Sequence, residues 1–309
     1  MAKILLAKGA RGEIVRKLQQ RLQGLGFDPQ GIDRAYGGNT QEAVRSFQQD
    51  SGLAPTGEVD VTTWAQLMGD PVPSVKDRSL QLTGTFEGHD FTLAQGNFDG
   101  AGVTWGIIGF TLQHGELGKI ILEINRRDPE LVRQAFGAKT DELLTTMQSS
   151  KAKQMAFANR ISLGATKERL AEPWRSAFAR FGEIPAVQAL QLELADRDYY
   201  QPARHTAQNL NMKTELGLAL IFDIHVQNGG IKESAHKAIA REIAEHPVTS
   251  EQELRVIIAN AVADNAKPKY REDVRARKLT IATGSGKVHK EMFLLRNWGL
   301  DESPCDPIG

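Results

Sequence analysis

The stretch Asp99-Gly100-Ala101-Gly102-Val103-Thr104-Trp105-Gly106-Ile107-Ile108-Gly109-Phe110 is the most informative part of the chain. It places a carboxylate in a glycine-rich turn, a hydroxyl five residues later, and then an apolar run. A second carboxylate, Glu87, lies twelve residues before Asp99. Two carboxyl groups that flank one bond can act as general acid and general base. Asp99 also has a simpler interpretation, because aspartate is a common N-cap of a following helix.

Composition narrows the class of protein. A length of 309 residues predicts one or two domains, and 40% hydrophobic with 25% charged residues is ordinary for a globular protein. Lys+Arg and Asp+Glu both number 38, and this balance argues against a nucleic-acid partner. The single cysteine, Cys305, excludes an intramolecular disulfide and a cysteine-based zinc site. The seven histidines lack metal-ligand spacing, so we expect neither metal nor cofactor, with His89 a weak candidate for lining a cleft.

The chain contains no stretch that approaches the roughly 20 apolar residues needed to span a bilayer. Near its start only Ile4-Leu5-Leu6-Ala7 is apolar before the next lysine, which is too short for a signal-peptide core. We therefore expect a monomer that is made in the cytoplasm without stable membrane insertion. If it acts elsewhere, another component must move it.

Apolar periodicity predicts a mainly α-helical protein. Residues 1–70 form a small three-helix module, in which Asn39 with Glu42 suggests a capping-box start and Asp60 a third helix cap. The prolines that follow Gly69 indicate a linker over residues 71–78. Residues 79–309 then form a helical domain large enough for two lobes. Within it, helices are expected over 117–124, 141–147, 150–163, 174–181, 185–194, 214–226, 232–245 and 251–263.

The N-terminal string is specific in its spacing. It reads Leu18-Gln-Gln-Arg-Leu22, Asp33-Arg-Ala-Tyr36-Gly37, Thr40-x-x-Ala43-Val44-x-x-Phe47-Gln48 and Thr56-Gly57-x-Val59-Asp60. This resembles the three-helix peptidoglycan-binding domain of cell-wall hydrolases, over about 60 residues. The apolar positions are expected to form the core. The candidates for ligand contact, on or beside the exposed loop, are Tyr36, Gly38, Thr40 and Gln48.

The pattern Asp-Gly-x-Gly-x-Thr-x-Gly-Ile-Ile-Gly-Phe from Asp99 resembles the signature of family 46 chitosanases, within the lysozyme-like superfamily. The similarity extends over roughly residues 80–280. It includes the segments Gly115-Glu116, Glu172-Pro-Trp174-Arg, Asp196-Arg-Asp-Tyr-Tyr-Gln-Pro-Ala203 and Phe222-Asp223. Trp105 and Trp174 are more simply read as core residues than as sugar platforms.

The resemblance implies roles for individual residues. Glu87 corresponds to the general acid, Asp99 to the general base, and Thr104 to the residue that positions the attacking water. Asp223 and Arg271 correspond to members of an ion-pair network that holds the acid, although a purely structural ion pair is an equal alternative. Glu116 corresponds to an acidic position that contacts substrate.

Six basic residues lie close together in the sequence near the C-terminus, and the sequence alone does not determine their function. A solvated helix face is the simplest interpretation, with Arg271 alone turned inward, because no interleaved aromatic beyond Tyr270 favours nucleic acid. The six are Lys267, Lys269, Arg271, Arg275, Arg277 and Lys278.

Together these features predict a two-module peptidoglycan hydrolase of the endolysin and muramidase type. It would cleave β-1,4 glycosidic bonds with two carboxylates, by inversion, after release through a separate membrane pore. Three alternatives stay open: a chitosanase, in which Glu116 and Asp198 hold cationic sugars; a lytic transglycosylase; and a non-catalytic wall-binding protein.

Overall fold

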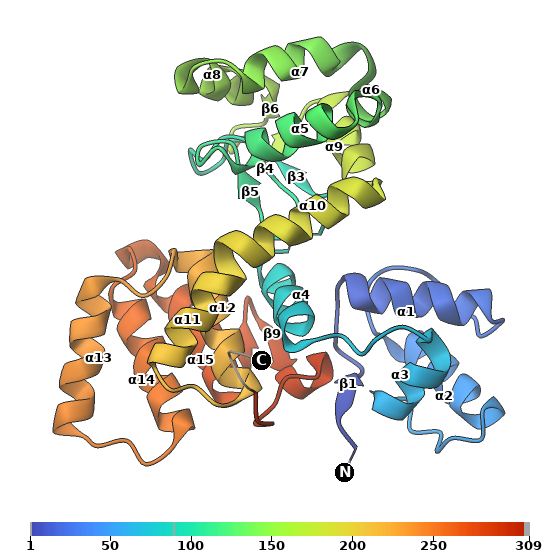
Figure 1. Cartoon of the computed structure of the whole chain (residues 1–309), viewed down its shortest axis with the longest axis vertical. Helices are drawn as coiled ribbons and strands as arrows, with labels where there is room; N and C mark the ends of the chain where they lie inside the picture. The colour runs from blue at the N-terminus through green and yellow to red at the C-terminus, as the bar shows by residue number, and fades with distance from the viewer. Residues whose placement is uncertain (1, 89, 306–309) are drawn as a thin grey trace. The chain divides into compact units, whose positions relative to one another are not determined.

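The computed structural model describes residues 2–88 and 90–305, and most of them are helical (Figure 1). The mainly α-helical class is therefore confirmed. Contacts divide the chain into two compact units: Met1–Phe86 with Asp198–Gly309 form unit 1, and Glu87–Arg197 form unit 2. This grouping differs from the sequence-based boundaries, because the N-terminal module shares a unit with the last third of the chain. In the described residues no helix is long and apolar enough to cross a membrane.

The N-terminal module contains the three expected helices. They are α1 (Glu13–Gly24), α2 (Gly38–Asp50) and α3 (Val61–Met68). Strand β1 (Ile4–Leu6) pairs antiparallel with β2 (Val59–Asp60) beside them. Their apolar faces form a core because the buried positions recur at helical spacing. The buried residues include Val15, Leu18, Leu22, Ala43, Val44, Phe47, Trp64 and Leu67.

One of the two predicted helix starts is confirmed and the other is wrong. Asp60 caps α3, with its Oδ1 accepting a hydrogen bond of 2.7 Å from the Thr63 amide. Asn39, however, already lies inside α2, whose N-cap is Gly37 without a side-chain cap. In this first turn the Thr40 hydroxyl accepts a buried 3.0 Å hydrogen bond from Gln19 Nε2, which links α2 to α1.

The rest of unit 1 is arranged around one central helix, α12 (Glu215–Asn228). Its first ten residues are all buried, as expected for a helix that is surrounded by others. The packing partners include α11 (Gln201–Asn209), α14 (Glu251–Asp264) and α15 (Arg271–Thr283). Helix α13 (Glu233–Glu245) packs on α14, and α4 (Val75–Glu87) belongs to this unit as far as Phe86.

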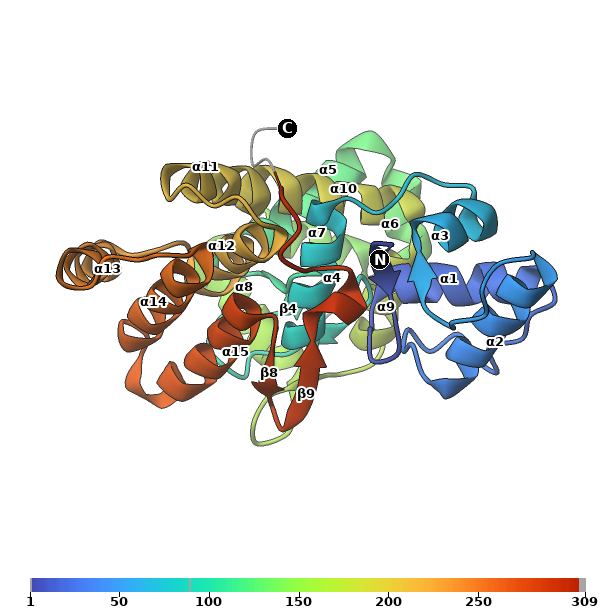
Figure 2. The ribbon, with the colours of Figure 1, turned by 90° about the horizontal axis from the view of Figure 1, so that it is seen from below.

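The C-terminal segment joins the N-terminal module to this helical lobe. After α15 comes the hairpin of β8 (Ser285–Val288) and β9 (Glu291–Leu294), visible as adjacent arrows in Figure 2. The 3-10 turn η4 (Leu295–Trp298) follows and packs on β1. The Ala7 amide donates to the Asn297 carbonyl at 3.0 Å, and Trp298 Nε1 donates to the Arg11 carbonyl at 3.2 Å.

A buried ion cluster strengthens the same junction. Arg78 of α4 donates to both carboxylate oxygens of Glu215, at 2.8 and 3.0 Å, and also to the Gly299 carbonyl. Lys3 adds a second ion pair to Glu215 at 2.6 Å and one to Asp301 at 2.7 Å. Paired, hydrogen-bonded charges can remain buried where a single charge cannot. The proline-containing segment before α4 therefore leads into a packed junction within unit 1, and does not act as a free tether.

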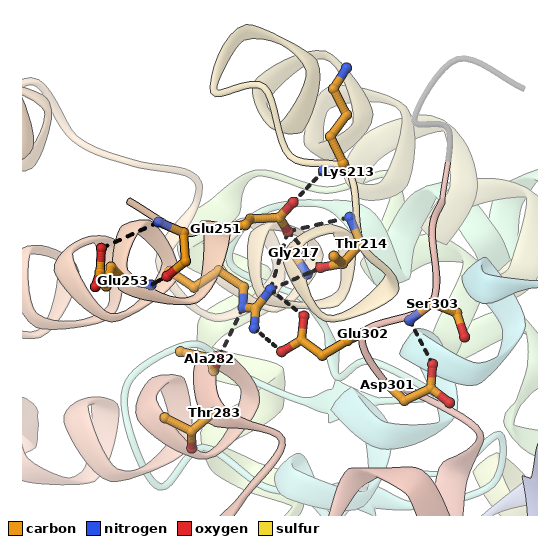
Figure 3. Close-up of polar contacts among 12 residues, drawn as sticks. Lys213, Thr214, Gly217, Glu251, Glu253, Ala282, Thr283, Asp301, Glu302 and Ser303 are labelled. Atoms are coloured by element: carbon orange, nitrogen blue, oxygen red, sulfur yellow. Dashed lines mark hydrogen bonds and ion pairs between the residues drawn. The ribbon is translucent and has the colours of Figure 1, made fainter. Parts of the chain in front are cut away.

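A second cluster fixes the segment around Glu302 against α12 and α14 (Figure 3). The fully buried Arg255 side chain donates to Thr214 Oγ1 at 2.9 Å and Glu302 Oε2 at 3.0 Å. Its Nε donates to the Ala282 carbonyl at 2.9 Å. In Figure 3 the Glu251 carboxylate lies against Thr214, whose hydroxyl donates to it at 2.5 Å. Residues 300–305 are thereby part of the packed structure.

Unit 2 surrounds a small antiparallel sheet, ordered β3 (Ala94–Gln95), β4 (Thr104–Trp105) and β5 (Phe110–Thr111). The buried Trp105 ring stacks on Phe181 at 5.4 Å between centroids, so the expectation that it is a core residue is confirmed. Trp174 is buried as well. The helices are α5 (Glu116–Arg127), α6 (Pro129–Phe136), α7 (Thr140–Met147), α8 (Lys151–Ile161), α9 (Trp174–Glu183) and α10 (Pro185–Ala195). Strands β6 (Ser162–Leu163) and β7 (Arg169–Leu170) form a separate pair.

Replacing Arg78 by alanine should destabilise unit 1 strongly. In this variant Lys3 is the remaining cation beside the buried Glu215 carboxylate. We expect the unfolding free energy to fall by about 3 kcal/mol, measured by urea denaturation. Arg45→Ala is the control, because the Arg45–Glu42 pair is exposed and should cost less than about 1 kcal/mol. Equal losses for the two variants would contradict the importance of the buried cluster.

Candidate active site

Asp99 lies in the loop between β3 and β4 of unit 2, and its side chain is exposed. Its Oδ1 accepts a hydrogen bond of 2.9 Å from the Ala101 amide, two residues later. This local turn fixes the carboxylate while leaving it in contact with solvent. The chain continues into strand β4, so the helix-cap interpretation of Asp99 is wrong.

Asn97 fastens the glycine-rich loop to the neighbouring segment. Its Oδ1 accepts from the Gly102 amide at 2.8 Å, and its Nδ2 donates to Asn159 Oδ1 at 2.9 Å. The Asn97 amide donates to Ser162 Oγ at 2.9 Å. These three bonds bracket Asp99 on both sides and hold its backbone to α8 and β6. The sequence reading missed Asn97, because an asparagine in a glycine-rich stretch is also typical of an ordinary turn.

Thr104 occupies the central strand of the three-stranded sheet, opposite Gln95 on one side and Thr111 on the other. Its side chain is buried, and its Oγ1 has no hydrogen-bond partner among the described residues. A buried hydroxyl without a partner is uncommon, because leaving it unpaired costs free energy. The role of this hydroxyl in holding a water molecule stays a prediction.

Glu87 is the last residue of α4 and is half-buried. One turn earlier in α4, the Thr83 hydroxyl donates a 2.9 Å hydrogen bond to Asp223 Oδ1 of α12. That contact fixes the last turn of α4 to the core of unit 1. The position of Glu87 thus depends on a buried polar contact beneath it. His89, the weak cleft candidate, lies outside the described residues.

Asp223 is completely buried and pairs with two adjacent cations of α15. Arg277 Nη2 donates to its Oδ1 at 2.7 Å, and Lys278 Nζ donates to its Oδ2 at 2.5 Å. Burial by itself raises the pKa of Asp223, but the charges and hydrogen bonds of Arg277 and Lys278 outweigh it and hold the pKa well below its ordinary value. The carboxylate therefore stays ionised inside the core.

The predicted partner of Asp223 is corrected by these contacts. Arg271 lies six residues before Arg277, about 9 Å along the helix axis, at the start of α15. The cations that meet Asp223 are Arg277 and Lys278, and both are buried. The sequence placed these two on a solvated face, because a run of cations gives no apolar periodicity that would indicate which members turn inward.

Three of the four predicted contact residues in the N-terminal module are structural. Tyr36, Thr40 and Gln48 are each at most 2% exposed. The Tyr36 hydroxyl donates to the Gly57 carbonyl at 2.9 Å, while Gln48 Nε2 donates to the Glu58 carbonyl at 2.8 Å. These side chains close the loops from within, which corrects the expectation that they touch ligand. Gly38 is exposed at the start of α2 and stays a candidate.

Glu116 begins α5, and its Oε2 accepts a 3.0 Å hydrogen bond from the Thr111 amide at the end of β5. The carboxylate thereby holds the turn between the sheet and the helix. Contact with substrate through this residue stays a prediction.

Comparisons with known proteins agree with this architecture. Residues 11–67 match the sequence profile of a peptidoglycan binding domain, and residues 84–255 match that of glycosyl hydrolase family 46. A mutant chitosanase from Bacillus subtilis MY002, solved with 6 GlcN, is 18% identical with a TM-score of 0.50, covering 72% of this chain and 95% of that one. A chitosanase from Gynuella sunshinyii, solved with chitotetraose, is 17% identical with a TM-score of 0.48, covering 73% and 99%. At such identities the likeness concerns the fold.

Replacing Asp223 by asparagine should cost about 3–5 kcal/mol of unfolding free energy, because two buried cations lose their shared counter-ion. The pKa of Asp223 is lowered by folding, so its contribution is complete above the ordinary carboxylate pKa. It should then be lost progressively as the pH falls below about 4. Urea denaturation from pH 7 to pH 3 should show the two proteins converging in acid.

The matched control is Asp264→Asn, which breaks a largely exposed pair with Arg275 and should cost less than about 1 kcal/mol. A difference between wild type and Asp223→Asn that does not change with pH would contradict the ionised carboxylate.

Proposed function

Because the chain belongs to glycosyl hydrolase family 46 and carries a peptidoglycan-binding domain, we propose that it hydrolyses the glycan strands of bacterial peptidoglycan. The observation that carries the choice of substrate is the match of the N-terminal module, over residues 11–67, to a peptidoglycan binding domain. This module shares unit 1 with residues 198–309, through the Arg78–Glu215 cluster and the η4 contacts. A wall-binding domain fixed to the enzyme raises the local concentration of wall polymer at the enzyme.

In this proposal Glu87 protonates the oxygen of the leaving sugar, and Asp99 removes a proton from the attacking water. The Thr104 hydroxyl, which lacks a partner in the described structure, would hold that water. The exposed turn of Asp99 leaves its carboxylate accessible to water, and Asn97 keeps this turn in place. We propose inversion at the anomeric carbon, which requires space for a water between the two carboxyl groups.

A chitosanase is the second candidate, favoured by the likeness in fold to a chitosanase solved with 6 GlcN. Chitosan carries cationic amino groups, whereas peptidoglycan carries acetylated sugars and anionic stem peptides. One digestion experiment separates them, with purified peptidoglycan and chitosan offered in parallel and the products analysed by mass spectrometry. We expect muropeptides with reducing muramic acid ends from peptidoglycan. Cleavage of chitosan alone would overturn the proposal.

Variants of the two carboxylates test the mechanism in the same assay. Glu87→Gln and Asp99→Asn should each lower kcat on peptidoglycan by about 10²–10⁴-fold, because each removes one proton-transfer group. Asp141→Asn, an exposed carboxylate of α7, is the control and should leave kcat unchanged. Full activity of Asp99→Asn with anhydro-sugar products would indicate a lytic transglycosylase. Unchanged wall lysis by Glu87→Gln would indicate that these carboxylates are not catalytic.

We also propose that the enzyme acts as a phage-type endolysin, made in the cytoplasm and released onto the wall through a separate membrane pore. The combination of a wall-binding domain with a glycoside hydrolase in one chain supports this setting. Expression in a bacterium together with a pore-forming protein should cause lysis, and expression alone should not. Lysis without the pore would contradict the dependence on it.

A further inference from the structure

The basic run near the C-terminus divides into two groups in the structure. Arg275 pairs with Asp264 at 2.6 Å, and the next two cations hold Asp223. The first three cations are different, because neither Lys267 nor Lys269 forms an ion pair with any described residue and both are exposed. Arg271 follows them, and its Nε is buried without a hydrogen-bond partner in the described structure.

These cations gather at one end of the α12–α15 pair. The two helices are antiparallel, since Asp223 meets Arg277 while Gly284 approaches Leu216. The start of α15 therefore lies towards the end of α12. A cavity of about 20 Å³ there is lined by Lys232, Asn228 and Asn265, among others, which brings Lys232 close to the start of the basic run. The cationic patch, as we use the term, comprises Lys232, Lys267, Lys269 and Arg271.

The charge of the cationic patch is not balanced by its surroundings. The nearby acids are already engaged: Asp264 and Glu272 with Arg275, Asp273 with His289, and Glu233 with Lys237. Arg271 also stands in the first turn of α15, where the helix dipole is positive and disfavours cations. Without an ion-pair partner in the described structure, the two exposed lysines Lys267 and Lys269 can pair with an anionic ligand.

An exposed aromatic ring completes the surface. Tyr270 is 45% exposed, and Lys269 Nζ lies 4.4 Å from the centroid of its ring. A solvent-exposed tyrosine ring can pack against the apolar face of a sugar, while its hydroxyl remains hydrated. An aromatic platform with surrounding cations is suited to a glycan that carries carboxylates.

We propose that the cationic patch and Tyr270 form a subsite for the stem-peptide carboxylates of a peptidoglycan strand, with the tyrosine against a sugar ring. This inference rests on the proposed function and names the part of the substrate that unit 1 recognises. It also gives a reason for rejecting chitosan, because ammonium groups of glucosamine would be repelled by the same charges. Arg271 of the patch lies on α15, the helix of Arg277, which holds Asp223 in the core.

The test compares wild type with the triple variant Lys232→Gln/Lys267→Gln/Lys269→Gln. On peptidoglycan freed of teichoic acid, the variant should show a KM raised about tenfold with kcat unchanged, since exposed charge contacts are individually weak. The wild-type KM should rise with added NaCl, and the variant KM should respond much less. On glycan strands stripped of stem peptides the two proteins should have the same KM.

The matched control is Lys153→Gln/Lys287→Gln/Lys290→Gln, which removes three exposed lysines elsewhere and should change nothing. If wild type does not cleave peptidoglycan, the proposed function fails. If wild type cleaves it and the triple variant has the wild-type KM, the subsite alone fails. An equal rise in the KM of the triple variant on intact and on peptide-free strands would also overturn the assignment to stem-peptide carboxylates. A rise in KM that occurs only when teichoic acid phosphates are present would overturn it as well.

Discussion

The buried carboxylate of Asp223 is the interaction on which the candidate site depends most. It joins three segments that are far apart in sequence: α4 through Thr83, the central helix α12 to which it belongs, and α15 through Arg277 and Lys278. None of these charges could remain in the core alone, since an unpaired buried charge is very costly. Their mutual requirement fixes the last turn of α4, which ends at Glu87. In the proposed mechanism Glu87 is the general acid, and proton transfer from it would depend on distance and direction.

The N-terminal module is part of the same packed unit, and this changes how a two-module enzyme is understood. The Arg78–Glu215 pair, the Lys3 contacts and the η4 turn tie together the first and last parts of the chain. The N-terminal module and residues 198–309 are therefore connected through an ordered junction within unit 1. A flexible linker gives an effective concentration that depends on its length, whereas a packed junction also restricts orientation.

The net charge is zero, but the charged residues are distributed unevenly over the structure. The acidic and basic residues are equal in number, yet one end of the α12–α15 pair carries cations without acidic partners in the described structure. The buried members of the same basic run serve the core, and its exposed members face solvent beside Tyr270. Within a single run of sequence, the residues before α15 are therefore exposed, while Arg277 and Lys278 inside α15 are buried.

The sequence by itself determined the helical class, the three-helix module and most helix positions, because these follow from apolar periodicity and caps such as Asp60. It also indicated the glycine-rich segment around Asp99 and Thr104. It could not determine which cations reach Asp223, since Arg271, Arg277 and Lys278 are equivalent until α15 is packed on α12. For the same reason it assigned Tyr36, Thr40 and Gln48 to a surface, whereas tertiary packing buries them as the partners of loop backbone groups. Local patterns are set by neighbouring residues, but the partner of a polar side chain is decided by residues that are distant in sequence, and only the folded chain brings them together.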